Sequence, residues 1–256
     1  RVRSCAQRSP RRIPPSAHDL RRGGDSVDVV TTSRSNEGRG PLYRIYINRL
    51  RRSLQSASVP KHVAMMIDGN RRWARQLGLD SPAEGHRAGA AKMREFLEWC
   101  DEVGVRVVSL YLLSNDNVKK RDSKEIADLI EIIAELADEL SRFRDWKVQH
   151  VGSTAGLPPE LVAVLQAAEQ RTKNNTGLHV NLAVGYGGRS EIVDAVRSII
   201  VDHDKKGGSL EELAESLTPE TIGEHLYTGG QPDPDLVIRT SGEQRLSDFM
   251  IWQSAH

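Results

Sequence analysis

Apolar segments of strand length alternate along this chain with longer segments of helical periodicity, and no hairpin turn signal separates them. Strands that alternate with helices in this way are typical of a parallel sheet with both faces covered. The sequence therefore predicts an α/β protein with a central parallel sheet flanked by helices. The expected strands are 62–67, 105–113, 146–152, 178–184 and 235–239, and the expected helices are 84–103, 123–144, 158–173 and 188–205, with shorter ones in 209–217 and 218–227.

The first 40 residues differ in composition from the rest. They hold nine arginines against four acids, with many Ser, Gly and Pro and almost no aromatic residues. Such a composition cannot bury a core, so we expect a disordered basic arm over 1–40 and one folded domain over 41–256. Residues 1–40 are either an Arg-rich targeting segment or, more simply, an N-terminal arm or the product of translation upstream of the natural start. Residues 41–50 are amphipathic and predict a helix.

Bulk properties argue against several classes of function. The formal net charge is +1, so no strong field points to nucleic acid or to an anionic membrane. No apolar run reaches the roughly 20 residues that span a bilayer. Cys5 and Cys100 match no metal or redox spacing and are most simply free thiols of a cytoplasmic protein. We therefore expect no nucleic-acid partner and at most peripheral membrane association.

The segment 62–74 carries the most informative chemistry. An apolar run of strand length stops at Asp68, and Gly-Asn and two arginines, Arg71 and Arg72, follow it. In an open parallel sheet, ligands bind at the carboxyl ends of the strands. A carboxylate beside arginines suits a magnesium–diphosphate, because the acid supplies an oxygen ligand and the guanidinium forks bind phosphate oxygens. For Asp-Gly-Asn alone, a strand end followed by a surface salt bridge is an equally good interpretation.

Polar side chains also follow two other expected strands. After 105–113 comes Ser-Asn-Asp-Asn at 114–117, with three cations at 119–121. Helix N-capping before 123–144 would explain one of these four polar residues, but not all of them. After 178–184 comes Gly-Tyr-Gly-Gly-Arg at 185–189, which would let backbone N–H groups and a helix N-terminus face an anion. A glycine-rich loop alone is a weak signal.

The densest polar set follows the expected strand 235–239. Two arginines and three hydroxyl side chains stand within the nine residues from Arg239 to Ser247. Each charge-assisted hydrogen bond to a phosphate contributes on the order of 1.5–3 kcal/mol, so the set predicts phosphate binding; the simpler alternative is a solvated loop. Together the strand ends predict one cationic crevice with few acids, in which Asp68 is the expected metal ligand.

Four motifs resemble the cis-prenyltransferases, the undecaprenyl diphosphate synthase-like enzymes. They are His-x-x-x-x-x-Asp-Gly-Asn-x-Arg-Trp-Ala at 62–74, Ser-x-Asp-Asn at 114–117, Asn-x-x-x-x-Tyr-Gly-Gly-Arg at 181–189, and Asp-Leu-Val-Ile-Arg-Thr-x-Gly-Glu-x-Arg-Leu-Ser at 235–247. The resemblance covers roughly residues 60–256. It implies a homodimer with a hydrophobic tunnel beside the sheet, and Mg²⁺-dependent condensation of isopentenyl diphosphate with an allylic diphosphate to form a cis double bond.

The resemblance also implies roles for individual residues. Asp68 holds Mg²⁺ and assists departure of the diphosphate, while Ser114 and Asn117 orient the diphosphates near the proton that is lost. The role of Asp68 is chemically reasonable, because an allylic C–O bond ionises once metal and arginine neutralise the leaving group. By the resemblance, Gly69, Asn70 and Arg72 bind the allylic diphosphate. Arg239, Arg245 and Ser247 bind the isopentenyl diphosphate. The further substrate-binding candidates are Arg71, Trp73, His86, Lys120 and Leu112.

This chain departs from the family pattern at several points. Arg71 stands where the family usually has a small residue, and the family's arginine after Ser-x-Asp-Asn corresponds to Lys120, or to Arg121 with a one-residue insertion. Leu112 takes the place of an alanine typical of long-chain enzymes. Because adjacent strand residues point to opposite faces, Leu112 and Leu113 should not both face the tunnel. These features resemble short-chain actinobacterial members of the Z-farnesyl diphosphate synthase type.

The C-terminal portion that the family uses to complete its site, with an acidic residue near the metal, is missing here. The apolar run 249–252 therefore resembles an interrupted element, and we expect poor stability or weak activity and an exposed apolar strand edge. Two alternatives to the short-chain enzyme stay open: a long-chain polyprenyl diphosphate synthase, and a non-catalytic partner subunit. Asp68 argues against the second, because partner subunits of the family lose the metal-binding motif.

Overall fold

The computed structural model describes residues 41–54, 58–79 and 81–255. The basic arm predicted at 1–40 lies outside the described residues. The chain divides into two compact units at Tyr46, and the second unit, Ile47–His256, contains the sheet. Helix α1 (Pro41–Leu54) confirms the helix predicted at 41–50. Among the described residues, no helix is long and apolar enough to cross a bilayer.

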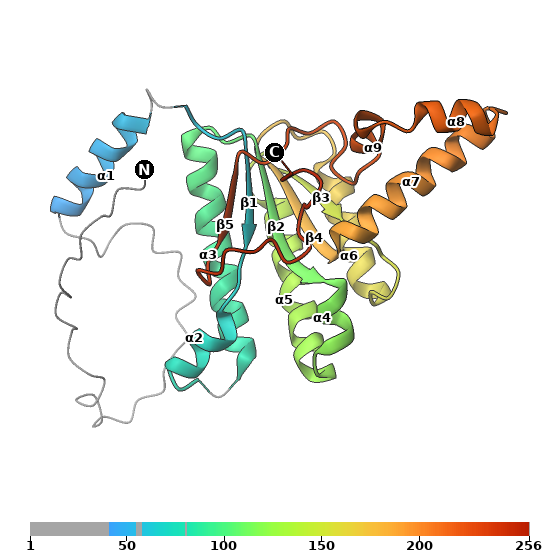
Figure 1. Ribbon diagram of the computed structural model, residues 1–256. Coiled ribbons are helices and arrows are strands. Elements are labelled where there is room, and N and C mark those ends of the chain that lie inside the picture. Colours follow the sequence, from blue (N-terminus) through green and yellow to red (C-terminus); the bar gives the residue numbers. More distant parts are fainter. Residues whose placement is uncertain (1–40, 55–57, 80, 256) are drawn as a thin grey trace, which may run out of the picture. The chain divides into compact units, whose positions relative to one another are not determined.

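In the described part of the chain, five strands form one parallel sheet in the order β3-β4-β2-β1-β5 (Figure 1). This confirms the predicted fold class and each predicted strand. The strand predicted at 178–184 extends to Tyr186, so the first two residues of the glycine-rich segment 185–189 belong to it. The strands are β1 (His62–Met66), β2 (Val107–Ser114), β3 (Lys147–Val151), β4 (His179–Tyr186) and β5 (Leu236–Arg239).

The helices between these strands match the predicted ones within a few residues, with two additions. The additions, α2 and α4, are short and each begins close behind the end of a strand. Ser114 caps α4 by accepting a hydrogen bond from the Asn117 amide at 3.0 Å, whereas Asp122 caps α5. The cap of the helix that begins at 123 is therefore none of the four polar residues 114–117, and the capping alternative does not explain them. The helices are α2 (Asn70–Gln76), α3 (Pro82–Val103), α4 (Asn115–Lys120), α5 (Ser123–Arg142), α6 (Pro159–Thr172), α7 (Gly188–Lys205), α8 (Leu210–Ser216) and α9 (Pro219–Glu224).

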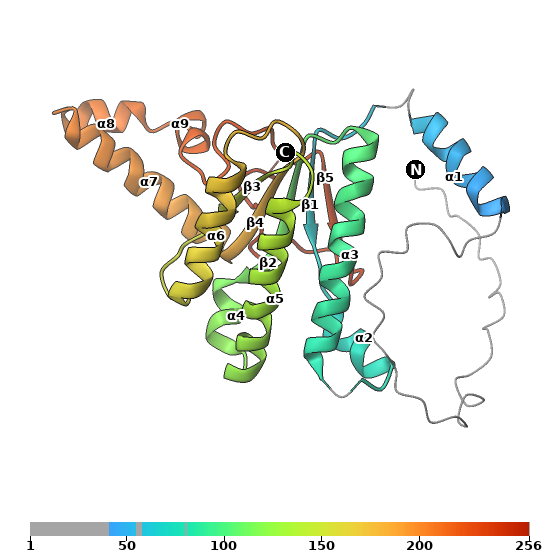
Figure 2. The ribbon, with the colours of Figure 1, turned by 180° about the vertical axis from the view of Figure 1, so that it is seen from behind.

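The larger hydrophobic cluster lies between one face of the sheet and three helices. Helices α3, α5 and α6 lie in front of the strands in Figure 2, and Leu97, Ile133 and Leu165 bring them into the cluster with Leu110 of β2. Each of these side chains is almost fully buried, and burying a leucine or isoleucine contributes about 1.5–3 kcal/mol. Burial of these side chains therefore stabilises the packing of the three helices against this face of the sheet.

A smaller cluster on the other face contains the first two residues of the C-terminal run 249–252. Phe249 and Met250 are buried, and the Phe249 ring stacks on Tyr111 of β2 with centroids 4.5 Å apart. The run forms turns rather than a strand. Phe249 and Met250 therefore fold back onto the sheet. The expected exposed apolar strand edge stays a prediction.

Strand β2 carries an irregularity at its carboxyl end. Its register against β4 shifts between Tyr111 and Leu113, and again between Leu113 and Ser114. Such a bulge interrupts the alternation of side chains between the two faces. Leu113 is a buried member of the larger cluster, and Leu112 packs against the same cluster. The prediction that these two leucines point to opposite faces is therefore wrong.

Candidate active site

The carboxyl ends of β1 and β5 meet, because the two strands are parallel neighbours in which Met66 pairs with Arg239. The Thr240 amide donates to the Met66 carbonyl at 3.2 Å and continues this pairing. The Thr240 hydroxyl then donates to the Asp68 carbonyl at 2.7 Å and accepts from the Asp68 amide at 2.9 Å. These contacts fix the residues that follow β1 against the loop that follows β5.

Asp68 and Arg239 form the central ion pair of this edge. The Arg239 Nη2 and Nε atoms donate to Asp68 Oδ2 at 2.5 and 3.1 Å. The side chain of Arg239 is 10% exposed and that of Asp68 is 43% exposed. Partial burial alone would raise the pKa of Asp68, but hydrogen bonds from Arg239 and Ser241 and the charge of Arg239 outweigh it and lower the pKa. Asp68 is therefore an ionised carboxylate at neutral pH.

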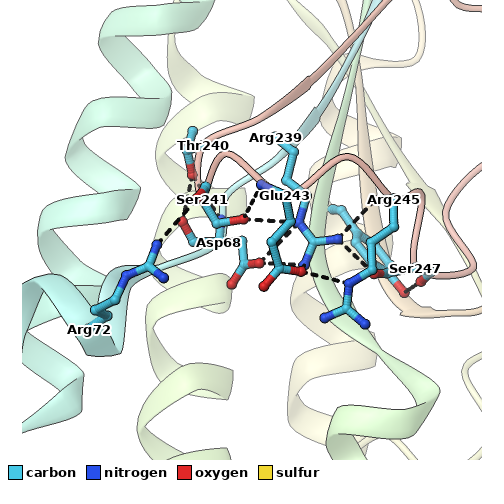
Figure 3. A network of polar contacts seen from close by, with 9 residues as sticks. Asp68, Arg72, Arg239, Thr240, Ser241, Glu243, Arg245 and Ser247 are labelled. Carbon is cyan, nitrogen blue, oxygen red and sulfur yellow. Dashed lines mark hydrogen bonds and ion pairs between the residues drawn. The ribbon is translucent and has the colours of Figure 1, made fainter.

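The loop from Arg239 to Ser247 wraps around the Arg239 guanidinium (Figure 3). Nη1 donates to the Arg245 carbonyl and to Ser247 Oγ, both at 2.8 Å, and Nε donates to Ser241 Oγ at 3.1 Å. Glu243 lies 2.9 Å from Nη2 of Arg239 and accepts from Arg245 Nε at 2.6 Å. The predicted phosphate-binding set therefore converges, but an acid that the prediction did not include bridges its two arginines.

Helix α2 adds one arginine to this network. Its N-cap is Gly69 at φ +102°, a left-handed conformation that suits glycine, and Arg72 Nη2 donates to the Ser241 carbonyl at 3.3 Å. Asn70 instead packs against α3, since a Cβ atom added at Gly89 would lie 2.6 Å from its Nδ2. Trp73 is 45% exposed. Of these predicted residues, Arg72 contacts the network around Asp68 through its side chain and Gly69 through its backbone amide.

A second polar cluster surrounds Glu125 of α5. Arg121 Nη1 donates to Glu125 Oε1 at 2.9 Å, and His86 Nε2 lies 3.5 Å from the same oxygen. Arg71 Nη1 is 3.6 Å from Oε2. Burial lowers the pKa of His86, and the charge of Arg121 lowers it further against the opposing effect of Glu125. Glu125 thus holds three basic side chains that come from α2, α3 and the α4–α5 junction.

The structure separates the two alternatives for the arginine after Ser-x-Asp-Asn. Lys120 pairs with Asp116 on its own helix, and its side chain is 73% exposed. The Arg121 side chain is only 17% exposed and lies in the Glu125 cluster. Burial lowers the pKa of Arg121, whereas the negative charges of Glu125 and Asp68 favour its protonated form. This placement favours the interpretation with a one-residue insertion, in which Arg121 corresponds to the family's arginine.

Ser114 and Asn117 sit at the end of β2 and in α4. Ser114 is buried, and its hydroxyl caps Asn117. Tyr111, three residues earlier, donates from its hydroxyl to the Ser247 carbonyl at 3.4 Å and so links this strand end to the Arg239 loop. Sequence reasoning missed Tyr111, Glu125 and Glu243. For Glu125 a signal existed, since it stands four positions after Arg121, a spacing that pairs opposite charges on helices.

The glycine-rich segment serves a different purpose from the one predicted. A Cβ atom at Gly187 would lie 2.9 Å from Asp248 Oδ2, so glycine lets Asp248 approach. The Gly188 amide donates to the Asp248 carbonyl at 2.7 Å, and the Arg189 amide donates to Asp248 Oδ1 at 3.2 Å. The N-terminus of α7 therefore faces a carboxylate of the chain itself, where the sequence had suggested an external anion.

Comparison with known proteins agrees with this geometry. Residues 66–256 match the prenyltransferase family model for undecaprenyl diphosphate synthases. The chain is 56% identical over 216 residues to a protein named (2Z,6E)-farnesyl diphosphate synthase of Thermobifida fusca, covering 84% of each chain. It is 51% identical over 215 residues to isoprenyl transferase 1 of Streptomyces avermitilis, covering 84% of this chain and 83% of that one. The chain belongs to the cis-prenyltransferase family.

A solved structure of another cis-prenyltransferase has the same fold. Lavandulyl diphosphate synthase from Lavandula x intermedia, crystallised with dimethylallyl diphosphate, superposes with a TM-score of 0.69 at 31% identity, over 78% of this chain and 84% of that one. A structure described as a probable undecaprenyl diphosphate synthase of Campylobacter jejuni gives a TM-score of 0.60 at 27% identity.

The donor set of this cis-prenyltransferase fits a magnesium ion that is shared with a substrate. Among the described residues, no group of three or more His, Cys, Asp or Glu side chains could hold a metal by itself. Mg²⁺ is usually bound by one or two carboxylates together with substrate phosphates and water. Asp68, partly exposed beside three arginines, provides such a carboxylate.

Proposed function

We propose that this cis-prenyltransferase condenses isopentenyl diphosphate with an allylic diphosphate and releases a short product with a new cis double bond. The observation that carries the proposal is the network of Asp68, Arg72, Arg239 and Arg245 at the carboxyl edge of β1 and β5. Relatives at about half identity are named as Z-farnesyl diphosphate synthases. One cis condensation onto an E-configured allylic diphosphate would give the (2Z,6E) pattern in those names.

The two sides of the network suggest two substrate positions. Arg72 and the backbone at Gly69, on the α2 side of Asp68, would receive the allylic diphosphate. Arg239, Arg245 and Ser247, on the β5 side, would receive the isopentenyl diphosphate. Mg²⁺ held at Asp68 would neutralise charge on the leaving diphosphate. Charge-assisted hydrogen bonds from the arginines would bind the phosphate oxygens and hold the two reacting carbons together.

The reaction then balances without further reagents. The allylic C–O bond breaks and its electron pair leaves with the diphosphate. The double bond of isopentenyl diphosphate attacks the allylic carbon, and the new C–C bond is compensated by loss of one proton. Ser114 ends β2 and Asn117 lies in α4 directly behind it, where they would orient the diphosphates near that proton. Arg121 would add positive charge on the α5 side, beside the neutral imidazole of His86.

Product length would be set at Leu112. This side chain packs at the carboxyl end of β2 against the larger hydrophobic cluster, two residues before Ser114. We place the growing hydrocarbon along that cluster, beside α3 and α5, where leucine would leave less room than alanine. The resemblance to the cis-prenyltransferases also supports a homodimer that is located in the cytoplasm, with at most peripheral membrane contact.

A product-length assay with radiolabelled isopentenyl diphosphate tests the proposal. The protein is supplied with Mg²⁺ and allylic diphosphates of increasing length, and the products are dephosphorylated and separated by chromatography. We expect a short product that disappears with EDTA. A ladder of long polyprenyl products would replace the short-chain proposal with the long-chain one. Absence of any product, with diphosphate binding retained, would favour the non-catalytic subunit.

A further inference from the structure

Each nitrogen of the Arg239 guanidinium already has at least one hydrogen-bond or ion-pair partner within the protein. Nε and Nη2 donate to Asp68, Nε also reaches Ser241, Nη1 donates to the Arg245 carbonyl and Ser247, and Nη2 contacts Glu243. An arginine offers five N–H groups in a fixed fork. A diphosphate oxygen can therefore bond directly to Arg239 only by replacing an acceptor that is already there.

Glu243 is the acceptor that is easiest to replace. Its carboxylate contacts Arg239 and Arg245 through the same oxygen, at 2.9 and 2.6 Å. Its side chain is 44% exposed, and it follows Gly242, which has φ +79°, on a loop without regular secondary structure. The Arg245 carbonyl, by contrast, is fixed in the backbone, and Asp68 is the proposed metal ligand.

The charges in this network also cancel. Asp68 and Glu243 supply two negative charges, and Arg239 and Arg245 supply two positive ones within the same chain of contacts. A diphosphate that entered with Glu243 still in place would meet a carboxylate beside the arginines that it needs. Like charges at such distances repel strongly where solvent is partly excluded.

We propose that Glu243 is an internal stand-in for substrate: it occupies Arg239 and Arg245 in the substrate-free protein and is displaced when a diphosphate binds. This inference rests on the proposed function, because it assumes that these two arginines receive a diphosphate. A carboxylate oxygen and a phosphate oxygen make the same kind of charge-assisted hydrogen bond. The exchange therefore replaces like with like and keeps both arginines preformed for the substrate, at the expense of some affinity.

The test measures binding of inorganic pyrophosphate by isothermal titration calorimetry, in EDTA, to the full chain and to Glu243→Gln. Glutamine keeps the size of the side chain and removes its charge. We expect pyrophosphate to bind Glu243→Gln about tenfold more tightly, which is the size of effect expected when one unit charge is removed beside a multiply charged anion in a partly solvated site. The matched control is Glu215→Gln on α8, which makes the same change of net charge outside the network and should bind like the unmodified protein.

A second measurement separates this role from simple support of the loop. If Glu243 competes with substrate, Glu243→Gln lowers the KM for isopentenyl diphosphate and leaves the KM for the allylic diphosphate nearly unchanged. Pyrophosphate binding to Glu243→Gln that is equal to or weaker than binding to the unmodified protein would overturn the inference and leave the proposed function standing. Loss of pyrophosphate binding by every form of the protein would instead overturn the assignment of Arg239 and Arg245, and with it the inference.

Discussion

The Asp68 carboxylate and the Arg239 guanidinium are 171 positions apart in the sequence, yet two Arg239 nitrogens donate to one Asp68 oxygen. The proposed metal ligand and the proposed isopentenyl diphosphate ligand are therefore a single bonded unit in the substrate-free protein. A change at either residue alters the charge that the other one feels. Kinetic predictions for the two have to allow for that coupling.

Asp68→Ala should lose most turnover while the protein stays folded. The carboxylate would hold the ion that neutralises the leaving diphosphate, and loss of a single group that stabilises developing charge typically costs about a hundredfold or more in kcat. Steady-state kinetics with a Mg²⁺ titration measures the effect, and thermal unfolding checks the fold. Asp202→Ala, on the exposed side of α7, serves as the control. Near-normal Mg²⁺-dependent turnover in Asp68→Ala would refute the assignment.

Arg245→Ala should raise the KM for isopentenyl diphosphate more than the KM for the allylic diphosphate. Loss of a charge-assisted hydrogen bond of about 1.5–3 kcal/mol corresponds to roughly tenfold or more. The Arg245 side chain is 69% exposed, so its removal should disturb the fold little. Arg239→Ala should act in the same direction but also destabilise the loop that wraps around it. A selective rise in the allylic KM would mean that the two substrate positions are exchanged.

Arg121 and Lys120 form a natural pair for comparison. Lys120→Ala removes an exposed ion pair within one helix and should change the unfolding free energy by at most about 0.5 kcal/mol with little effect on catalysis. Arg121→Ala should lower kcat/KM about tenfold and also destabilise the fold, because Glu125 loses its closest cation. The double variant Arg121→Ala with Glu125→Ala should recover stability without recovering activity. Equal kinetic effects at both positions would contradict the placement of Arg121.

Much of the fold follows from the sequence because its strands and long helices have clear periodicity. The apolar runs indicate each strand to within three residues, and a parallel sheet places Asp68 and Arg239 at the same edge. Helices α2 and α4 could not be recognised in this way, because six or seven residues are too few to show a helical period. The bulge that turns Leu113 toward the same cluster as Leu112 is likewise invisible to a pattern of period two.

The site was predictable in its residue types but not in its internal pairing. The motifs gave the arginines and Asp68, yet nothing in them indicates that Glu243 would bridge Arg239 and Arg245. Nor could the sequence show that Asp248 would approach the N-terminus of α7, because the Arg189 amide that binds it lies 59 positions earlier. Contacts of this kind depend on how loops from distant strands meet, which local patterns do not encode.

The buried Glu191 should make stability depend on pH. Burial raises its pKa above the ordinary value of 4.5, against the lowering effect of hydrogen bonds from Tyr186, Gln253 and the Tyr227 amide. The folded state then holds a proton that the unfolded state has released, so the unfolding free energy falls as pH rises from the ordinary pKa of 4.5 through the raised pKa of the folded state. Urea unfolding should show a shallower fall for Glu191→Gln than for the unmodified protein. Parallel curves would contradict a raised pKa.

Leu112→Ala should lengthen the product and leave the chemistry intact. Leucine places three more side-chain heavy atoms than alanine at the carboxyl end of β2, next to the site, and a packed interior cannot absorb extra groups without strain of roughly 1–3 kcal/mol. A growing chain that meets Leu112 should therefore stop after very few condensations. Chromatography of dephosphorylated products from the two proteins, at equal turnover, measures the change.

The neighbouring Leu113 provides the matched control for this prediction. Both leucines pack on the same cluster, but Leu113 is fully buried, whereas Leu112 is only partly buried. Leu113→Ala removes the same atoms from the core and should cost about 2–5 kcal/mol of stability without a longer product. If Leu112→Ala leaves product length unchanged, Leu112 is ordinary core and the product is limited elsewhere. If the unmodified protein already makes long chains, the leucine does not block elongation, and the long-chain alternative takes the place of the short-chain proposal.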